Sequence, residues 1–361
     1  MSNVTTYSDL HAFHPGYYVE EIIEEMSISQ AEFAKRMGTT AKTVSQLVSG
    51  KIRLTNDLAQ KLASMTGMDI KTWLNLQQEY DLRVQEIEHQ KALDEQASIV
   101  KCIDYSFFVR VAQLPATRKI EEKIINLCGF LRISDLRILL QPDFLVNYRA
   151  GISSFDDKNL INARVWVQTS MNAALRMKVG QFNAEQLKNY LPEIRSMTRK
   201  APDEFLPRLK AIFSECGVRF VLLPSLKNSG INGAVKWFEG DQVMLALNDR
   251  RSYADTFWFA LFHEIKHVLQ QKTRTVFVSY NTKPENETEL EKEADQFAED
   301  YLISPRSYLS FVNASHFTEE AINEFAERID IHPGIVVGRL QNDKKIHPSQ
   351  YNHLKQKYKI I

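Results

Sequence analysis

Two histidines, His263 and His267, are spaced so that they can hold a metal ion. They lie four residues apart, and Glu264 directly follows the first of them. Residues at this spacing share one face of a helix, so both imidazoles point to the same place. Zinc in hydrolytic sites takes nitrogen and oxygen ligands in a tetrahedral arrangement and keeps one position open for water. Glu264 is placed to act as the general base on that water.

Apolar neighbours distinguish a buried metal site from a pair of solvated histidines. A surface helix with two solvated histidines is the alternative interpretation of the same spacing. Two buried histidines and a buried glutamate need polar partners, and a metal ion supplies them. The flanking residues favour burial, because most of the helix is apolar: Phe257, Trp258, Phe259, Leu261, Phe262, Val268 and Leu269.

A second helix downstream is expected to supply the third protein ligand, because glutamate is typical when one helix provides two histidines. Glu291 lies at one border of the apolar stripe of this helix, and Asp295 follows one turn later on the same side. We therefore predict Glu291 as the ligand and Asp295 as the acceptor for the free N–H of a ligating histidine. Glu289 and Glu293 are predicted to belong to a solvated acidic face.

Three segments around these residues carry a family resemblance: Phe257–His267, Glu291–Ala298 and Tyr301–Pro305. They resemble the ImmA/IrrE family of metallopeptidases, and the resemblance covers roughly residues 205–345. It implies a compact gluzincin-like domain that hydrolyses peptide bonds in a few protein substrates, such as a repressor or a toxin partner.

The resemblance also implies a set of site residues. One zinc ion would be held by His263, His267 and Glu291, with Glu264 catalytic. Lys266 stands where the family commonly has a small residue, often glycine. This departure leaves the ligands intact and affects the packing and surface of the helix that carries them.

Composition limits the class of protein. A length of 361 residues is typical of two or three domains, and 44% hydrophobic residues can form sizeable cores. Lys plus Arg equals Asp plus Glu, at 45 each, so the overall charge indicates no particular partner. Three widely separated cysteines are not a disulfide framework and fit a reducing compartment. We see no signal peptide and no apolar run of membrane-spanning length, so a cytoplasmic protein without a membrane partner is expected.

The pattern of residues 14–75 predicts a small all-helical unit. Ser29 begins one helix and Gly38 ends it, and Thr39 or Thr40 caps the next. A helix, a short turn with glycine and a second short helix form the helix-turn-helix pattern.

Exposed residues of this unit favour DNA binding. The span 33–56 contains five basic residues and no acidic one. We expect Gln30 and Lys51 to contact phosphates, while the third helix enters the major groove. Four of its residues would reach base edges or nearby phosphates: Thr40, Lys42, Thr43 and Ser45. The alternative is a generic helical bundle whose basic residues are merely solvated.

This unit also carries a resemblance. Its segments His14–Gly16, Ser29–Ala34, Ser45–Lys51 and Trp73–Leu82 resemble HigA-type antitoxins of the Xre class. The resemblance covers roughly residues 12–85. It implies a lambda-repressor-like module of five helices that forms homodimers on palindromic operators in double-stranded DNA and represses its own operon.

Between the two motif-bearing regions, residues 86–200 predict a helical linker or middle domain without chemistry of its own. Helical periodicity is strongest over Ile120–Leu127, Ile133–Leu140 and Ala163–Val179.

Beyond residue 201 we expect a helix over Phe205–Cys216, which Gly217 ends, and then strands. Val218–Leu223 predicts one strand, and Asn232–Phe238 with Gln242–Leu247 predict a hairpin, giving a three-stranded sheet before the histidine helix. We expect Gly233–Trp237 or Met244–Ala246 to form an open edge that could pair with an extended substrate.

Together these features predict a mainly α protein with a small α+β domain. A lambda-repressor-like helix-turn-helix module (12–85), a helical middle (86–200) and a gluzincin-like zinc metallopeptidase domain (201–361) would follow one another. The expected function is a DNA-binding regulator or antitoxin whose zinc endopeptidase cleaves a specific partner. The alternative is a non-catalytic antitoxin or repressor whose zinc domain docks or senses a partner.

Overall fold

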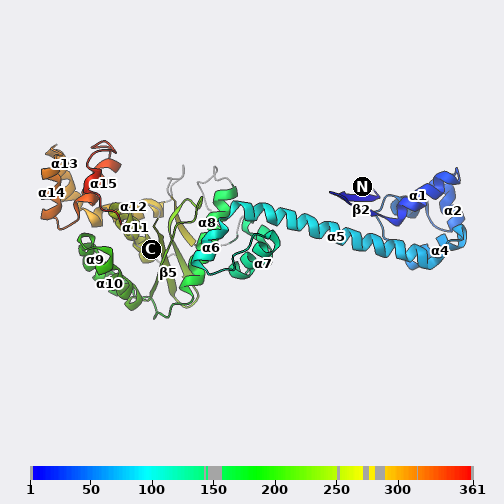
Figure 1. Cartoon of the computed structure of the whole chain (residues 1–361), viewed down its shortest axis with the longest axis horizontal. Coiled ribbons are helices and arrows are strands. Elements are labelled where there is room, and N and C mark those ends of the chain that lie inside the picture. Colours follow the sequence, from blue (N-terminus) through cyan, green and yellow to red (C-terminus); the bar gives the residue numbers. More distant parts are fainter. Residues whose placement is uncertain are drawn as a thin grey trace. The chain divides into compact units, whose positions relative to one another are not determined.

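In a computed structural model the chain divides into two compact units, Met1–Ala97 and Ser98–Ile361 (Figure 1). The structure describes residues 3–141, 144, 157–249, 253–270, 276–280 (backbone only), 289–314 and 316–358. Most of the described chain is helical, with two small sheets. The predicted boundaries at residues 85 and 200 stay predictions.

The first unit is a β-hairpin followed by five helices. The helices agree with the predicted helix-turn-helix unit, and Thr40 rather than Thr39 caps the third of them. The hairpin, by contrast, was not predicted. The elements are β1 (Val4–Tyr7), β2 (Leu10–Phe13), α1 (Pro15–Glu25), α2 (Gln30–Met37), α3 (Ala41–Val48), α4 (Asn56–Thr66) and α5 (Ile70–Cys102).

Local capping and one close approach hold α1, α2 and α3 together. The Ser29 hydroxyl accepts the amide of Glu32 at the start of α2, and Gly38 ends α2 in the left-handed conformation that glycine tolerates. Gly16 on α1 lies so close to the backbone of Leu47 on α3 that a Cβ there would overlap it. A core of aliphatic and aromatic side chains fills the space between the helices: Val19, Phe33, Leu47, Leu62 and Trp73.

Side chains of helix α5 make hydrogen bonds to other elements of its unit. The Gln77 side chain accepts the buried amide of Leu54, which holds the segment after α3 against α5. Further along, the Tyr7 hydroxyl of β1 donates to Asp94, 2.9 Å away. The hairpin therefore braces the later, charged part of α5.

The second unit contains a four-stranded sheet and the remaining helices. The span predicted as a helix at 133–140 is a 3-10 helix over Leu136–Leu140, and the helix predicted over 163–179 ends at Ala174. The elements are α6 (Tyr105–Val111), α7 (Ile120–Leu131), α8 (Asp157–Ala174), α9 (Ala184–Ser196), α10 (Pro202–Glu215), β3 (Val218–Leu223), β4 (Ile231–Phe238), β5 (Gln242–Asn248), α11 (Ala254–Gln270), β6 (Val276–Tyr280), α12 (Glu289–Leu302), α13 (Pro305–Asn313), α14 (Glu319–Arg328) and α15 (Pro333–Asn342).

The strand order β3-β5-β4-β6 corrects the predicted sheet edge. The hairpin β4–β5 is confirmed, with Gly233 opposite Leu247. However, β3 pairs with β5 in parallel and β6 pairs with β4 in antiparallel. Both strands expected to be open, β4 and β5, are therefore interior, and the expectation was wrong. Among the described strands, the edges of the sheet are β3 and β6.

Helices cover both faces of this sheet. Side chains of α10 and α11 share one core with alternate residues of the strands, such as Val235 and Leu245. On the opposite side, α8 contacts β3, β4 and β5 and is buried along much of its length (Figure 1). The indole N–H of Trp166 on α8 donates to the carbonyl of Pro224, which follows β3.

Arg195 joins the ends of two helices in this unit. Its guanidinium donates to the carbonyls of Tyr301 and Leu302 at the end of α12, and to that of Ile329 after α14. These carbonyls lack partners within their own helices, and a cation also suits the negative end of the helix dipole. The side chain therefore fixes α12 relative to α9 and α14.

The C-terminal segment holds the beginning of α11. The amide of Ala254 donates to the carbonyl of Gln356, and the indole N–H of Trp258 donates to the hydroxyl of Tyr358. The donor–acceptor distance is 2.8 Å in each bond. Lys355 pairs with Asp255 at 2.6 Å. The helix that carries His263 is thus anchored at its first turns.

No helix among the described residues combines the length and the apolarity needed to cross a membrane.

Candidate metal centre and nucleic-acid interface

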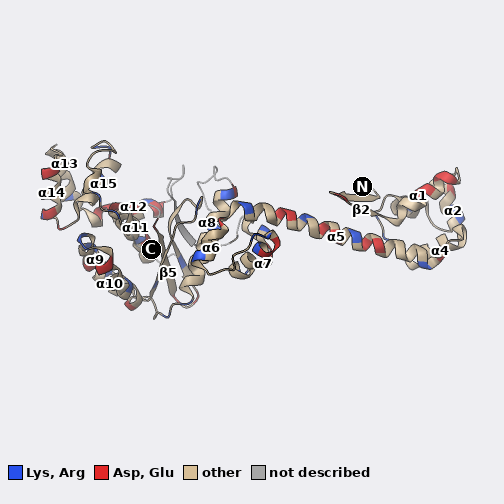
Figure 2. Ribbon diagram, viewed as in Figure 1, with Lys and Arg blue, Asp and Glu red and all other residues tan. Residues whose placement is uncertain are grey.

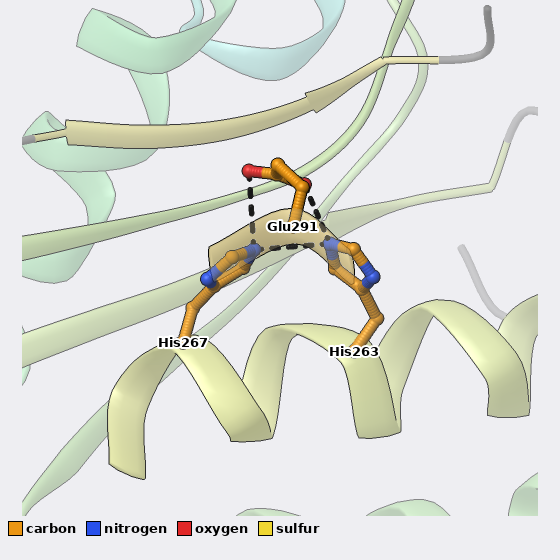
Figure 3. A group of neighbouring side chains, drawn as sticks. All are labelled: His263, His267 and Glu291. Atoms are coloured by element: carbon orange, nitrogen blue, oxygen red, sulfur yellow. Dashed lines mark hydrogen bonds and ion pairs between the residues drawn. The ribbon is translucent and has the colours of Figure 1, made fainter. Parts of the chain in front are cut away.

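Helix α11 presents both histidines to one carboxylate of α12 (Figure 3). The Nε2 atoms of His263 and His267 lie 3.0 Å apart. The carboxylate of Glu291 reaches both, at 3.3 Å from Nε2 of His263 and 3.4 Å from Nε2 of His267. His267 is fully buried and His263 nearly so. The structure thus brings together the three residues predicted as ligands.

The donor set and its spacing suit a zinc ion. Two imidazole nitrogens and a carboxylate oxygen are ligands of hydrolytic zinc sites, and the three atoms lie within 4.8 Å of one another. A tetrahedral ion with bonds of about 2.0–2.2 Å separates its ligand atoms by about 3.3–3.5 Å. Each imidazole already has one oxygen of Glu291 at this distance, Oε2 for His263 and Oε1 for His267. The two Nε2 atoms need to separate by only a few tenths of an ångström.

The Nδ1 atom of each histidine, on the side of the ring away from the cluster, contacts a further side chain. Asp295, one turn after Glu291 on α12, accepts the Nδ1–H of His263 at 2.9 Å. The side-chain oxygen of Gln270 lies 2.9 Å from Nδ1 of His267. Asp295 was predicted for this role from helix phase. Gln270 was not, although its position three residues after His267 on the same helix face could have indicated it.

The electrostatics of the cluster favour a positive charge between the side chains. Burial opposes charge on His263, but Asp295 and Glu291 outweigh burial and raise the pKa of His263 to about 10. For Glu291, burial alone would raise the pKa of the carboxylate. The two histidines outweigh burial and lower the pKa of Glu291 to about 2. The same arrangement that attracts a proton would attract a metal cation.

Glu264 is fully buried beside the cluster and lies against strand β4. Its carboxylate occupies the space in front of Gly233, where any Cβ would overlap it. Strand β4 can approach α11 this closely because position 233 has no side chain. Only the structure reveals this contact, because the strand pattern alone does not place Gly233 near α11.

The neighbouring acidic residues of α12 point elsewhere. The side chain of Glu293 is 55% exposed and lies 3.6 Å from the ammonium of Lys266, outside the cluster. Glu289 pairs with Lys292 at the surface. Lys266 therefore lies on the outer side of α11 and leaves the atoms of the histidine–glutamate cluster undisturbed.

The residues predicted to contact DNA lie on α2, at the N-cap of α3, on α3 and just after α3. Lys42, Ser45 and Lys51 are exposed, whereas Gln30 and Thr43 are partly buried. The Thr40 hydroxyl accepts the amide of Thr43 at 3.1 Å and lies 2.8 Å from the Thr43 hydroxyl. The main structural role of Thr40 is therefore to cap the N-terminus of α3.

Charge is unevenly distributed over the first unit. Acidic residues gather on α1, and both signs alternate along α5 (Figure 2). Of the basic residues in the span 33–56, Arg36 pairs with Glu32 and Arg53 pairs with Asp81. Within the described part of the chain the other three have no ion-pair partner, which leaves their charge available to phosphate: Lys35, Lys42 and Lys51.

Comparison with known proteins shows which family the first unit resembles. A model of the helix-turn-helix family matches residues 19–73. The uncharacterized HTH-type transcriptional regulator YddM of Escherichia coli (strain K12) is 38% identical over 68 residues, which are 19% of this chain and 72% of that protein. Antitoxin HigA-1 of Vibrio cholerae is 40% identical over 62 residues, 17% of this chain and 58% of the antitoxin.

A solved structure is also similar to part of the chain. It is that of an addiction module antidote protein of the HigA family from Coxiella burnetii. The two chains are 28% identical, with a TM-score of 0.22, and the match covers 23% of this chain and 92% of that one. Through its first unit, the chain belongs to the family of helix-turn-helix transcriptional regulators.

Proposed function

We propose that this protein is a DNA-binding regulator of the antitoxin type whose second unit is a zinc-dependent endopeptidase acting on a specific protein partner. Membership of the helix-turn-helix family supports the regulator. The observation that carries the peptidase is the convergence of His263, His267 and Glu291 on one point beside the buried Glu264. A solely structural metal site has no need of that fourth residue.

The side chains around the cluster divide the work of peptide hydrolysis. A zinc ion held here would polarise the substrate carbonyl and lower the pKa of a water molecule. Glu264 would accept the proton of the attacking water and pass it to the leaving amine. Asp295 keeps His263 in the tautomer that leaves Nε2 free for the metal.

Strand β6 is the edge at which we expect an extended substrate to pair. It is an edge strand, and its only partner among the described strands is β4, which carries Gly233 against Glu264. An edge strand offers unpaired backbone groups to an added peptide strand. Strand β6 is the direct neighbour of β4, the strand that touches Glu264, whereas β3 is separated from β4 by β5. We therefore prefer β6 over β3 as the edge for the substrate.

DNA recognition is assigned to α3 and the residues after it. We predict that Lys42→Ala abolishes specific binding to the DNA upstream of the protein's own gene, because Lys42 is exposed on the helix that enters the major groove. Lys51→Ala should weaken binding to all sequences alike and lower the salt dependence by about one phosphate contact. Gel shifts over a range of salt concentrations measure both effects.

Lys119→Ala is the matched control for these variants, because Lys119 is 76% exposed and lies in the second unit. It should bind DNA as the wild type does. If wild-type protein gives no shift even at low salt, the first unit does not bind that DNA and the regulator assignment fails for that promoter.

The ligand role of Glu291 can be separated from that of its neighbour. Glu291→Gln should lower zinc affinity by more than about tenfold, because it removes a charged ligand from a buried site. Glu293→Gln should lower affinity much less, because that side chain is exposed and, among the described residues, reaches no histidine directly, contacting only Lys266 and the amide of Gln270. Competition against a chelating dye measures both, and the opposite ranking would exchange the two roles.

A further inference from the structure

Gln270, the last residue of α11, links both helices of the metal cluster. Its oxygen lies 2.9 Å from Nδ1 of His267, and its amide nitrogen donates to the carbonyl of Leu290 in the first turn of α12, 3.1 Å away. The same nitrogen lies 3.2 Å from a carboxylate oxygen of Glu293. One side chain therefore contacts a candidate ligand on α11 and the residue directly before the candidate ligand Glu291 on α12.

These contacts determine which nitrogen of His267 carries hydrogen. The carbonyl of Leu290 and the carboxylate of Glu293 can only accept hydrogen bonds, so the Gln270 amide must turn its N–H groups toward them. Its oxygen then faces His267. Because that oxygen can only accept, Nδ1 of His267 must be the donor, and Nε2 is left with a lone pair directed at the cluster.

We propose that Gln270 is a positioning residue for the metal centre, an inference that rests on the proposed function. It selects the Nε2-ligating tautomer of His267 and ties the end of α11 to the turn that carries Glu291. Asp295 performs the first of these tasks for His263. The two histidines are thus oriented differently, one by a carboxylate from α12 and the other by an amide from their own helix.

The test is the zinc affinity of purified full-length protein in competition with a chelating dye, for wild type, Gln270→Leu and Gln270→Glu. Leucine has a similar size but accepts no hydrogen bond, so affinity should fall about 10–100-fold. Glutamate offers His267 an acceptor whichever oxygen faces it but cannot donate to the carbonyl of Leu290, so it should restore only the part of the loss that comes from the tautomer of His267. Gln296→Leu, an exposed glutamine on α12, is the matched control and should bind zinc as the wild type does.

Thermal melting of the metal-free proteins separates positioning from folding. Gln270→Glu should melt cooperatively and bind zinc more tightly than Gln270→Leu, even if the leucine variant is unstable. Wild-type affinity in Gln270→Leu, or an equal loss in the leucine and glutamate variants, would overturn the role of Gln270 while leaving the zinc site in place. If the wild type itself binds no zinc, the proposed peptidase site fails, and this inference fails with it.

Discussion

Glu264→Gln is expected to remove peptidase activity while leaving zinc and DNA binding intact. The substitution keeps the size of a fully buried side chain and both histidines. It removes the base placed beside the cluster, and loss of a general base typically costs about 10²–10⁴ in rate. The helix-turn-helix module belongs to the other compact unit, so promoter repression should not change.

Co-expression with the proteins of the same operon measures this effect. The partner should be cut or lost with the wild-type protein and should persist with Glu264→Gln, as followed by immunoblot. Glu289→Gln provides a control with the same chemical change at an exposed position that pairs with Lys292 at the surface, and it should cleave as the wild type does. If every partner has the same fate with wild type and Glu264→Gln, the second unit docks or senses a partner without cutting it.

Helix phase and capping made much of the site predictable. His263, Glu264 and His267 lie on a helix whose apolar residues enter the core, so burial of this face follows from the 3.6-residue period. On α12, the same period places Glu291 and Asp295 on one side, where the structure finds both against His263. Local patterns of this kind need no knowledge of distant contacts.

Features that depend on long-range pairing were not predictable in the same way. Strand β6 follows α11 in the sequence and joins the sheet beside β4. Its addition makes β4 an interior strand and makes β6 the new edge. A five-residue strand outside a hairpin offers little local signal. The contact of Gly233 with Glu264 likewise depends on tertiary packing. The first hairpin, Val4–Phe13, is local, but its strands are only four residues long and one of its side chains is held by Asp94 of α5.

His263→Ala is the second substitution with a large expected effect. It removes one of three ligand atoms and leaves Asp295 without the N–H that it accepts in a partly buried position. Zinc in a hydrolytic site normally needs three protein ligands, so the remaining pair, His267 and Glu291, should not retain the ion through purification. We expect lower stability of the metal-free variant as well, because the partly buried carboxylate of Asp295 loses one hydrogen-bond partner.

His89→Ala is the matched control, since His89 is an exposed residue of α5 in the other compact unit. It should change neither the zinc content nor the melting of the second unit. A His263→Ala protein that still melts cooperatively shows that any loss of zinc reflects the missing ligand rather than a failure to fold.

The central claim, that a helix-turn-helix regulator carries a zinc centre built from α11 and α12, is tested most directly by metal analysis of purified protein. The wild type and His89→Ala should each contain about one zinc ion per chain, and His263→Ala should contain almost none. Equal zinc in His263→Ala and wild type, or a wild-type protein that neither contains nor takes up zinc, would contradict the claim.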